Sequence, residues 1–449
     1  MNTALIRKYN VPGPRYTSYP TVPFWDPNSF NIEHWKRDLK ESFDQNNEIS
    51  LYIHLPFCEH LCVYCGCNTR ITKNHKVEER YINALFREWD LYLKVLEAKP
   101  VLKELHLGGG TPTFFSPANL DRLLKRIIGT CIIPEEKEFS FEGHPNNTSE
   151  SHLKILYEKG FRRVSFGIQD FDPNVQRLIK RIQPYENVTK VVEKARSIGY
   201  QGVNFDLIYG LPGQTLSTIK NTLSKTISLS PDRIAFYSYA HIPHMKPAQR
   251  SFEKFLPPDE EKRSLYEFGK RLLNENGYED IGMDHFARKT DDLYLAQKER
   301  KLHRNFMGYS LHPTKTLIGL GVSAISDSWT AFSQNEKVVE KYYSLLEKGE
   351  LPVVKGHRLN HLDILLRKKI LDMICHFEAT WSAHEWLQFK EEINWELIRQ
   401  LEEDGLIKMS LSGIKVTQKG CPFIRNICMA FDARLLNESN QKVVFSKTI

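Results

Sequence analysis

The sequence predicts an α/β protein, a partial and open TIM-type β/α barrel with an N-terminal strap and a small, mostly helical C-terminal domain. Three observations lead to this prediction. Strand-like apolar runs alternate with helical periodicity over much of the first half of the chain, a pattern typical of a parallel sheet covered by helices. Chemically distinctive residues follow several of these runs, as expected where a barrel gathers its chemistry at the C-terminal ends of its strands. The pattern changes near Gly356.

The alternation can be followed along the chain. Residues Leu51 to Leu55 form an apolar run that predicts a strand, and residues 78 to 97 repeat apolar side chains at a helical period. Later units follow the same rule, with helices expected near residues 117–128 and 149–159 and strands at Leu102–Leu107, Glu138–Phe141, Arg163–Ile168, Gly202–Tyr209 and Arg233–Tyr239.

The predicted domains are an N-terminal segment that closes over substrate (residues 1–45), the barrel (46–355) and the C-terminal domain (356–449). Asn360 and Asp363 have the spacing of a capping box at the start of a C-terminal helix. Residues 406–411 and 414–416 predict a hairpin that turns at Ser412-Gly413. A helix with a hairpin resembles a winged helix, but the hairpin carries only two lysines, so we expect no nucleic-acid binding.

Composition sets the broad class. The chain has 449 residues, 41% hydrophobic and 26% charged, which is ordinary for a globular protein of two or three domains. Eight cysteines are too few for a disulfide scaffold. We find no apolar signal-peptide core and no membrane span, so we expect a cytoplasmic protein. The net charge of +7 suits an anionic small molecule or a nucleic acid, although it is most often only a solvated surface.

Three cysteines with the spacing C-x3-C-x2-C follow the first predicted strand: Cys58, Cys62 and Cys65. Three thiolates on a [4Fe–4S] cube leave one iron open to bind a reactant. The alternatives are a zinc site or a disulfide knot. Zinc sites usually pair one C-x2-C with a second pair far along the chain, and no such pair occurs among Cys131, Cys375, Cys421 and Cys428.

This spacing, with Tyr64 before the third cysteine, resembles the radical S-adenosylmethionine (SAM) superfamily. The resemblance implies a partial TIM barrel of the radical SAM kind, open at one side. The glycine run from Gly108 to Thr111 lets the backbone approach a ligand closely, and in that superfamily it lies against the methionine end of SAM. The simpler reading of the run is a tight turn between strand and helix.

A narrower resemblance covers nearly the whole chain. The sequence is similar to oxygen-independent coproporphyrinogen III oxidases, through the segments YNVPGPRYTSYPT (9–21), YIHLPFCEHLCVYCGCN, HLGGGTPT, FGIQDF, DLIYGLPGQT, IGMDHFAR (281–288), LHRNF (302–306), LGVSAIS (320–326) and RNICMAFD (425–432). Cys67 and the segment PGPRYTSYP are typical of the oxidase, whereas related haem carriers tend to have an aromatic residue at the position of Cys67. Arg15, Tyr16 and Tyr19 are expected to close over a tetrapyrrole carboxylate, or simply to form a strap packed on the barrel.

The resemblance implies roles for individual residues. The three cysteines hold the cluster, Tyr64 flanks the adenine, and Tyr52, Gly109 and Glu142 contact the first SAM. A second SAM site corresponds to Gly110, Thr111, Gln169, Arg181, Asp206, Ala240 and Ile325. The expected catalytic residues are Cys67, His54 and Glu142. Cys67 is expected to lie too far along the chain to be a fourth cluster ligand, and it is a candidate hydrogen donor or relay.

The implied reaction is radical oxidative decarboxylation. Two propionates of coproporphyrinogen III lose CO2 and a β-hydrogen and become the vinyls of protoporphyrinogen IX, as part of haem biosynthesis. Because the β C–H bond is unactivated, the cofactor must supply a radical. A low-potential donor such as flavodoxin or ferredoxin, an unknown electron acceptor and a monomeric chain are expected. The alternatives are a haem-binding or haem-transfer protein without oxidase activity, and another radical SAM reaction such as tRNA modification.

Two residues depart from the family pattern. Met307 stands where the family usually has Gln, and a thioether cannot replace the donors of an amide. His144 stands where Asp is common. The change at Met307 leaves open which contact is lost near the substrate or the second SAM, whereas His144 leaves Glu142 unaffected.

Overall fold

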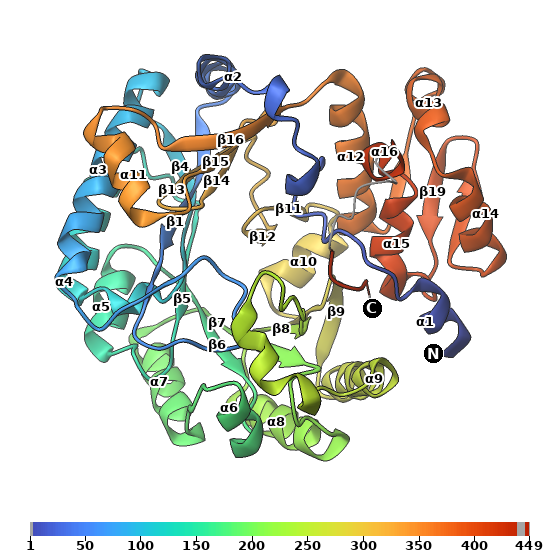
Figure 1. Ribbon diagram of the computed structural model, residues 1–449, viewed down its shortest axis with the longest axis horizontal. Helices are drawn as coiled ribbons and strands as arrows, with labels where there is room; N and C mark the ends of the chain where they lie inside the picture. Colours follow the sequence, from blue (N-terminus) through green and yellow to red (C-terminus); the bar gives the residue numbers. More distant parts are fainter. Residues whose placement is uncertain (1–2, 438–444, 449) are drawn as a thin grey trace.

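A twelve-stranded sheet curves around the centre of the protein (Figure 1). The computed structural model describes residues 3–437 and 445–448. Within these residues nothing pairs the first strand of the sheet with the last, so the barrel is open. In spatial order the strands are β16 (Val353–Arg358), β15 (Ala331–Asn335), β14 (Ile325–Asp327), β13 (Thr316–Leu320), β1 (Glu48–Leu55), β4 (Val101–Gly109), β5 (Glu138–Gly143), β6 (Arg163–Gln169), β7 (Gly202–Tyr209), β8 (Arg233–Ser238), β10 (His285–Arg288) and β9 (Tyr278–Gly282).

The seven central strands, from β13 to β8, are parallel. Every strand expected from the sequence is present and differs only at its ends. The strands at both edges of the sheet are antiparallel, which the sequence analysis did not foresee. The connections from β9 to β10, from β13 to β14 and from β14 to β15 are too short for a parallel crossover. β9 and β10, for example, are joined by Met283 and Asp284, whose positive φ angles of 46° and 69° suit a two-residue hairpin turn.

Helices cover the outer face of the sheet, as Figure 1 shows. The expected helices appear as α3 (Val77–Leu96), α4 (Pro117–Gly129) and α5 (Glu150–Glu158). They are followed around the barrel by α7 (Tyr185–Ile198), α8 (Leu216–Leu229) and α9 (Asp259–Glu275). The buried faces of these helices join the apolar side chains of the strands in one large core. Because helices and core fill the outer side, the polar strand ends are left to face the interior.

The N-terminal segment is divided between two cores. Its second helix, α2 (Ile32–Gln45), buries Trp35, Leu39 and Phe43 in the barrel core. Tyr16 and Tyr19 lie instead in the core of the C-terminal domain, only 1% and 2% exposed. Both rings are used in packing, and closure of this segment over substrate stays a prediction.

The C-terminal domain begins with α12 (His361–His376), and Asn360 and Asp363 form the expected capping box. A three-stranded sheet of β17 (Glu378–Thr380), β19 (Gly413–Val416) and β18 (Ile407–Ser410) includes the expected hairpin and one further strand. Around it lie α13 (Ala383–Phe389), α14 (Trp395–Glu403), α15 (Ile424–Met429) and α16 (Ala433–Asn437). Because β16 carries the barrel sheet as far as Arg358, we propose a domain boundary at residues 359–360 instead of 355–356.

One arginine ties the two ends of the described chain together. Arg425, on α15, donates hydrogen bonds to the carbonyl oxygens of Pro14 (2.9 Å), Gly13 and Lys447 (3.0 Å). The strap is thereby fixed beside the C-terminal domain. None of the helices in the described residues is both long and apolar enough to cross a membrane.

We predict that a buried carboxyl on β4 makes stability depend on pH. Burial raises the pKa of Glu104 to about 7, despite hydrogen bonds from Ser310 and Ser50 and with Glu138 and His106 nearby. A folded-state pKa above the unfolded value means that the neutral form is favoured, so this stability is present at acidic pH and is lost as pH rises through about 7. Thermal unfolding between pH 5.5 and 8.5 should show the wild type losing stability relative to Glu104→Gln.

Exposed Glu97→Gln is the matched control, because the same change on the surface removes no buried carboxyl. Parallel melting curves for the wild type and Glu104→Gln across this range would contradict the prediction.

Candidate active site

A cavity of about 770 Å³ opens at the C-terminal ends of the central strands. This volume is within the range of small-molecule sites. It collects most of the residues that the sequence singled out: Cys58, Cys62, Tyr64, Cys65, Cys67, Gly109, Gly110, Thr111, Glu142, Gln169, Arg181, Asp206 and Ala240 all line it. Tyr52, His54 and Ile325 are not among its lining residues.

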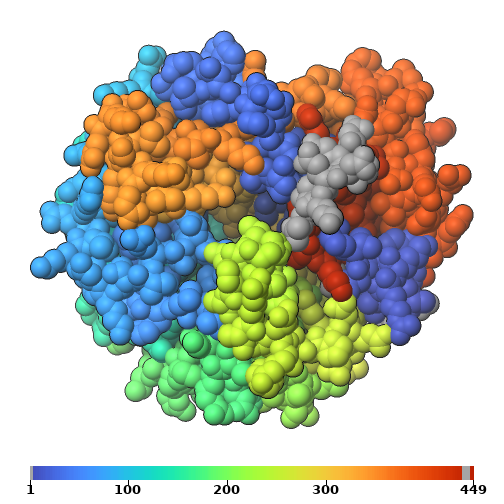
Figure 2. Space-filling view, in the orientation of Figure 1, coloured from blue at the N-terminus to red at the C-terminus, as the bar shows by residue number. Residues whose placement is uncertain are grey.

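The cysteine loop is held from outside by hydrogen bonds to its backbone. Gln249 Nε2 donates to the carbonyl of Tyr64 at 3.0 Å, and Lys246 Nζ donates to that of Cys67 at 2.8 Å. Gln249 belongs to the 3-10 segment Pro247–Phe255, which lies across the front face beside the blue region that includes the loop (Figure 2). These hydrogen bonds therefore hold the loop in place through contacts within the protein itself.

The three cysteines of the motif fit an iron–sulfur cluster. All three are partly buried and line the same cavity, and the thiol of Cys58 lies 3.4 Å from Thr111 Oγ1. In the described residues no three His, Cys, Asp or Glu side chains converge closely enough to bind a single ion. A [4Fe–4S] cube takes its thiolates on separate irons, so its ligands need not converge on one point.

Arg181 supplies positive charge beside these thiols. It follows the helix α6 (Pro173–Leu178), and its Nη1 donates to the sulfur of Cys62 at 3.6 Å while Nη2 donates to the carbonyl of Gly167 at 2.5 Å. Its Nε is buried and has no hydrogen-bond partner among the described residues. A guanidinium in this position leaves a donor for a bound anion.

Cys67 lies closer to the motif than its spacing suggested. Its thiol is within hydrogen-bonding reach of Cys65, although it remains exposed to the cavity. The expectation that Cys67 lies outside the set of cluster ligands stays a prediction. The need for one open iron remains a reason for it not to bind the cluster.

Glu142, at the end of β5, is a carboxylate directed into the cavity. It accepts a hydrogen bond from the Gly109 amide at 3.3 Å, and His106 Nε2 lies 3.6 Å from its other oxygen. Burial alone would raise the pKa of Glu142, but the His106 hydrogen bond and the Gly109 amide outweigh it and lower that pKa. An ionised carboxylate at this position can accept hydrogen bonds from an ammonium group or ribose hydroxyls.

His54 lies behind the cavity wall and is 6% exposed. Its Nε2 donates to the carbonyl of Asn68 at 2.9 Å, so Nδ1 accepts the hydrogen bond from the Tyr52 hydroxyl at 3.0 Å. Burial lowers the pKa of His54, which keeps the ring neutral. Both ring nitrogens are hydrogen-bonded in this structure, and a catalytic role for His54 stays a prediction.

Two polar residues line the opposite side of the cavity from different strands. Gln169 ends β6 in the left-handed region, with φ of 66°, where a register shift in the β6–β7 pairing turns the chain. Asp206 lies on β7 and accepts from Ser165 Oγ at 3.2 Å. Burial, followed by the nearby charge of Glu142, raises the pKa of Asp206 to about 7.

Ile325, which was expected at the second SAM site, does not line the cavity. It packs beside Trp25 and Phe332.

Sequence reasoning missed several residues around the cavity. His106 supports Glu142 from β4, and Lys180 and Tyr237 line the cavity directly. His144, which was discounted, also lines it, and burial lowers its pKa to about 3. Met307 borders a neighbouring space of about 250 Å³ that shares Glu142 and Asp206 with the main cavity. The alternation of inward-facing and outward-facing side chains along β4 could have indicated His106 from the sequence. The other residues named here belong to no sequence motif that would have indicated them.

The fold and the three-thiol cavity define the class of protein. A family model described as the Radical SAM superfamily matches residues 52–226. The chain therefore has a radical SAM domain, which implies a [4Fe–4S] cluster and SAM as cofactors.

Curated relatives and a solved structure narrow the family. Proteins from Synechocystis sp. and Escherichia coli, both named oxygen-independent coproporphyrinogen III oxidase, are 37% and 38% identical to this chain, with 99% of this chain covered in each case and 97% and 98% of the relatives. The solved structure of coproporphyrinogen III oxidase (HemN) from Escherichia coli, described as a radical SAM enzyme, has a TM-score of 0.88 at 36% identity and covers 96% of this chain and 98% of its own. This chain belongs to the oxygen-independent coproporphyrinogen III oxidase family.

We predict that Gly109→Ala weakens SAM binding by about tenfold or more. Gly109 has a φ of +115°, and an added Cβ would lie 2.8 Å from the His54 ring. Alanine must therefore shift the backbone whose amide holds Glu142. Equilibrium dialysis of SAM against the reconstituted protein measures the loss, and absorbance measures the cluster content.

Gly129→Ala is the control, since a Cβ there meets nothing within 4 Å at the exposed end of α4. Unchanged SAM affinity in Gly109→Ala would show that this backbone does not position the ligand.

Proposed function

We propose that this protein converts coproporphyrinogen III to protoporphyrinogen IX without oxygen, in haem biosynthesis. The observation that carries the proposal is the placement of three thiols and an ionised Glu142 around one cavity, in a chain related over its full length to enzymes of that name. Each of two propionates loses a β-hydrogen atom, then CO2, and an electron passes to an acceptor that we do not identify. The two side chains become vinyl groups.

The proposed cofactor site uses residues already in place. We propose Cys58, Cys62 and Cys65 as the cluster ligands, and Tyr64, Gly109 and Glu142 as contacts of a SAM on the open iron. The cluster with SAM supplies the radical that removes the unactivated hydrogen atom. Tyr52 supports this site from behind the wall, through its contact with His54.

We also propose a second SAM, bound by Gly110, Thr111, Gln169, Arg181, Asp206 and Ala240. Arg181 fits a carboxylate, because its buried Nε lacks a partner among the described residues. Ile325 is left out of this set because it packs away from the cavity. The protein's own residues thus provide an anionic contact at Glu142 and a cationic one at Arg181.

Further parts of the proposal rest on the family alone. We propose a low-potential donor such as flavodoxin or ferredoxin, a monomeric chain and a cytoplasmic location. Cys67 stays a candidate hydrogen donor or relay, since its thiol is exposed in the cavity. The alternative, a haem-carrying protein without oxidase activity, is not favoured by the relatives that match this chain over nearly its full length.

The oxidase proposal is tested by product analysis. Anaerobic protein, reconstituted with iron and sulfide, is given dithionite, SAM and coproporphyrinogen III, and chromatography follows 5′-deoxyadenosine and vinyl products. We expect divinyl product from the wild type and none from Cys62→Ser, because a missing thiolate removes a cluster ligand. Met307→Gln, which restores the amide, should retain product formation.

SAM cleavage without vinyl product would point to another substrate. An intact cluster with no cleavage, together with haem retention, would favour the carrier.

The second SAM is tested by binding stoichiometry. Gln169→Asn shortens the side chain by one methylene yet tolerates the left-handed backbone. We expect the second equivalent of SAM to be lost while the cluster content stays unchanged, as measured by equilibrium dialysis. Exposed Gln201→Asn is the matched control. A single equivalent bound by the wild type would contradict the two-SAM proposal.

A further inference from the structure

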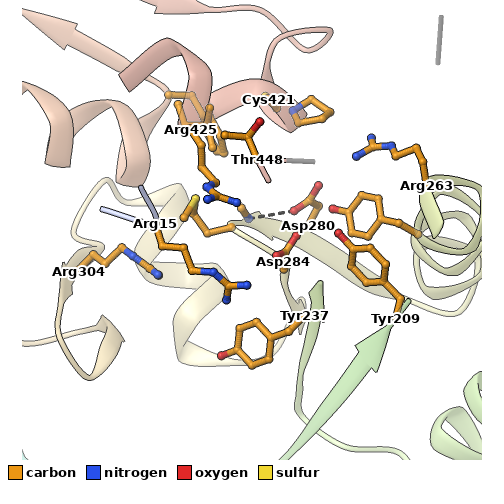
Figure 3. A pocket seen from close by; sticks show the side chains of 16 residues that line it. Arg15, Tyr209, Tyr237, Arg263, Asp280, Asp284, Arg304, Cys421, Arg425 and Thr448 are labelled. Atoms are coloured by element: carbon orange, nitrogen blue, oxygen red, sulfur yellow. Dashed lines mark hydrogen bonds between the residues drawn. The ribbon is translucent and has the colours of Figure 1, made fainter. Parts of the chain in front are cut away.

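A second, smaller pocket lies between the barrel and the C-terminal domain (Figure 3). Its volume is about 60 Å³, and its lining comes from the strap, from β7, β8 and β9, from the turn after β9, from α9, from β11 (His303–Asn305) and from the C-terminal domain, including α15. Arg15 and Tyr237 line both this pocket and the main cavity, so the two spaces adjoin. None of the cysteines of the motif lines the smaller pocket.

Arg304, on β11, is the feature that needs explanation. Its side chain is directed into the pocket (Figure 3), and the residue is only 7% exposed. Its Nε and Nη1 are buried without a hydrogen-bond partner among the described residues, and its guanidinium lies 4.8 Å from the ring centre of Tyr309. Because a buried, unpartnered cation is costly, this arrangement indicates an anionic ligand.

The other charged groups of the pocket have partners within the fold. Arg425 donates to backbone carbonyls of the strap and the C-terminal segment, and Arg263 is paired with Glu267. Asp280 is paired with Lys270. Arg15 makes one long hydrogen bond, 3.3 Å from Nη2 to the carbonyl of Ser238, and faces the buried Asp284. Arg304 and Arg15 are therefore the donors best placed for a ligand.

The size of the pocket limits what that ligand is. About 10–15 Å³ of such volume holds one water molecule, so 60 Å³ accepts a carboxylate with a short arm and excludes a macrocycle. Two guanidinium groups favour a carboxylate, which they bind through paired hydrogen bonds. A tetrapyrrole in the main cavity carries four propionate arms, and an arm that reaches past Tyr237 enters this pocket.

We propose that Arg304, together with Arg15, binds a propionate carboxylate that is not being decarboxylated and so anchors the tetrapyrrole against the barrel wall. This inference rests on the proposed function, because it takes the tetrapyrrole as substrate. The pocket is separate from the cysteine loop, so the anchored arm is kept from the reacting centre. Arg304 is a substrate-binding residue and takes no part in the radical chemistry.

Binding and kinetics of the reconstituted holoenzyme test the proposal. The binding probes are coproporphyrin III, which keeps the four carboxylates, and its uncharged tetra-amide, both followed by fluorescence under anaerobic conditions. Arg304→Gln should weaken binding of the tetracarboxylate by about tenfold or more, and the tetra-amide by less than about twofold. The KM for coproporphyrinogen III should rise by a similar factor with a smaller change in kcat, and Arg304→Lys should recover part of the loss.

The control is Arg300→Gln, at an exposed arginine near β11 that is paired with Glu378 on the surface. If Arg304→Gln does not fold, as judged by thermal unfolding, Arg15→Gln and Arg304→Lys carry the same comparison of acid and amide. Tetracarboxylate binding within about twofold of the wild type in folded Arg304→Gln or Arg15→Gln overturns the proposal.

Failure of this inference is distinguishable from failure of the oxidase proposal. Vinyl formation with an unchanged KM in Arg304→Gln removes the anchoring subsite and leaves the oxidase. Loss of acid-over-amide preference in that variant, with no vinyl formed by the wild type, leaves the carboxylate subsite and removes the oxidase.

Discussion

The close contact between the glycine run after β4 and the segment that enters the cysteine loop is the constraint on which the site depends. The amides of Gly110 and Thr111 donate to the carbonyls of Leu55 and Phe57 at 2.9 and 3.0 Å. A Cβ on Gly110 would lie 2.6 Å from the Pro56 oxygen, so only glycine allows this approach. The parallel register of β1 and β4 brings the ends of the two strands to the same edge of the sheet, so the segments that follow them lie side by side. The cysteine loop and the glycine run are thus placed relative to each other by this backbone contact.

The two carboxyl groups that share the main cavity come from different strands of the barrel and differ in their pKa. Glu142 on β5 is kept ionised by His106 and the Gly109 amide, whereas burial and the charge of Glu142 leave Asp206 on β7 with a raised pKa. Neighbouring carboxyls that share a cavity tend to differ in this way, because like charges disfavour simultaneous ionisation. Two arginine side chains also line the cavity: Arg181, beside the cysteines, and Arg15, on the strap. One space can therefore accept both cationic and anionic groups of its ligands.

The strap connects the two domains to this space. Tyr16 is anchored in the C-terminal core, where its hydroxyl donates to Asp432 at 3.0 Å, and Arg425 holds the backbone just before it. Arg15 lies between these attachments and is the strap residue that lines both cavities. The C-terminal domain thus contributes to the site through the segment it holds, without supplying any cysteine of the C-x3-C-x2-C motif.

The local sequence pattern was enough to predict most elements of the barrel and part of the candidate site. Strand and helix periodicity located the barrel elements, and the spacing of Cys58, Cys62 and Cys65 indicated the cluster, because these signals act over a few neighbouring residues. Only the tertiary structure decided which side of a wall each side chain faces. His54 and Ile325 turned away from the cavity, while Cys67 came beside Cys65. Arg304 and Arg15 are 289 positions apart in the sequence and line the same pocket, a proximity that packing of strap, barrel and C-terminal domain creates and that no periodicity encodes.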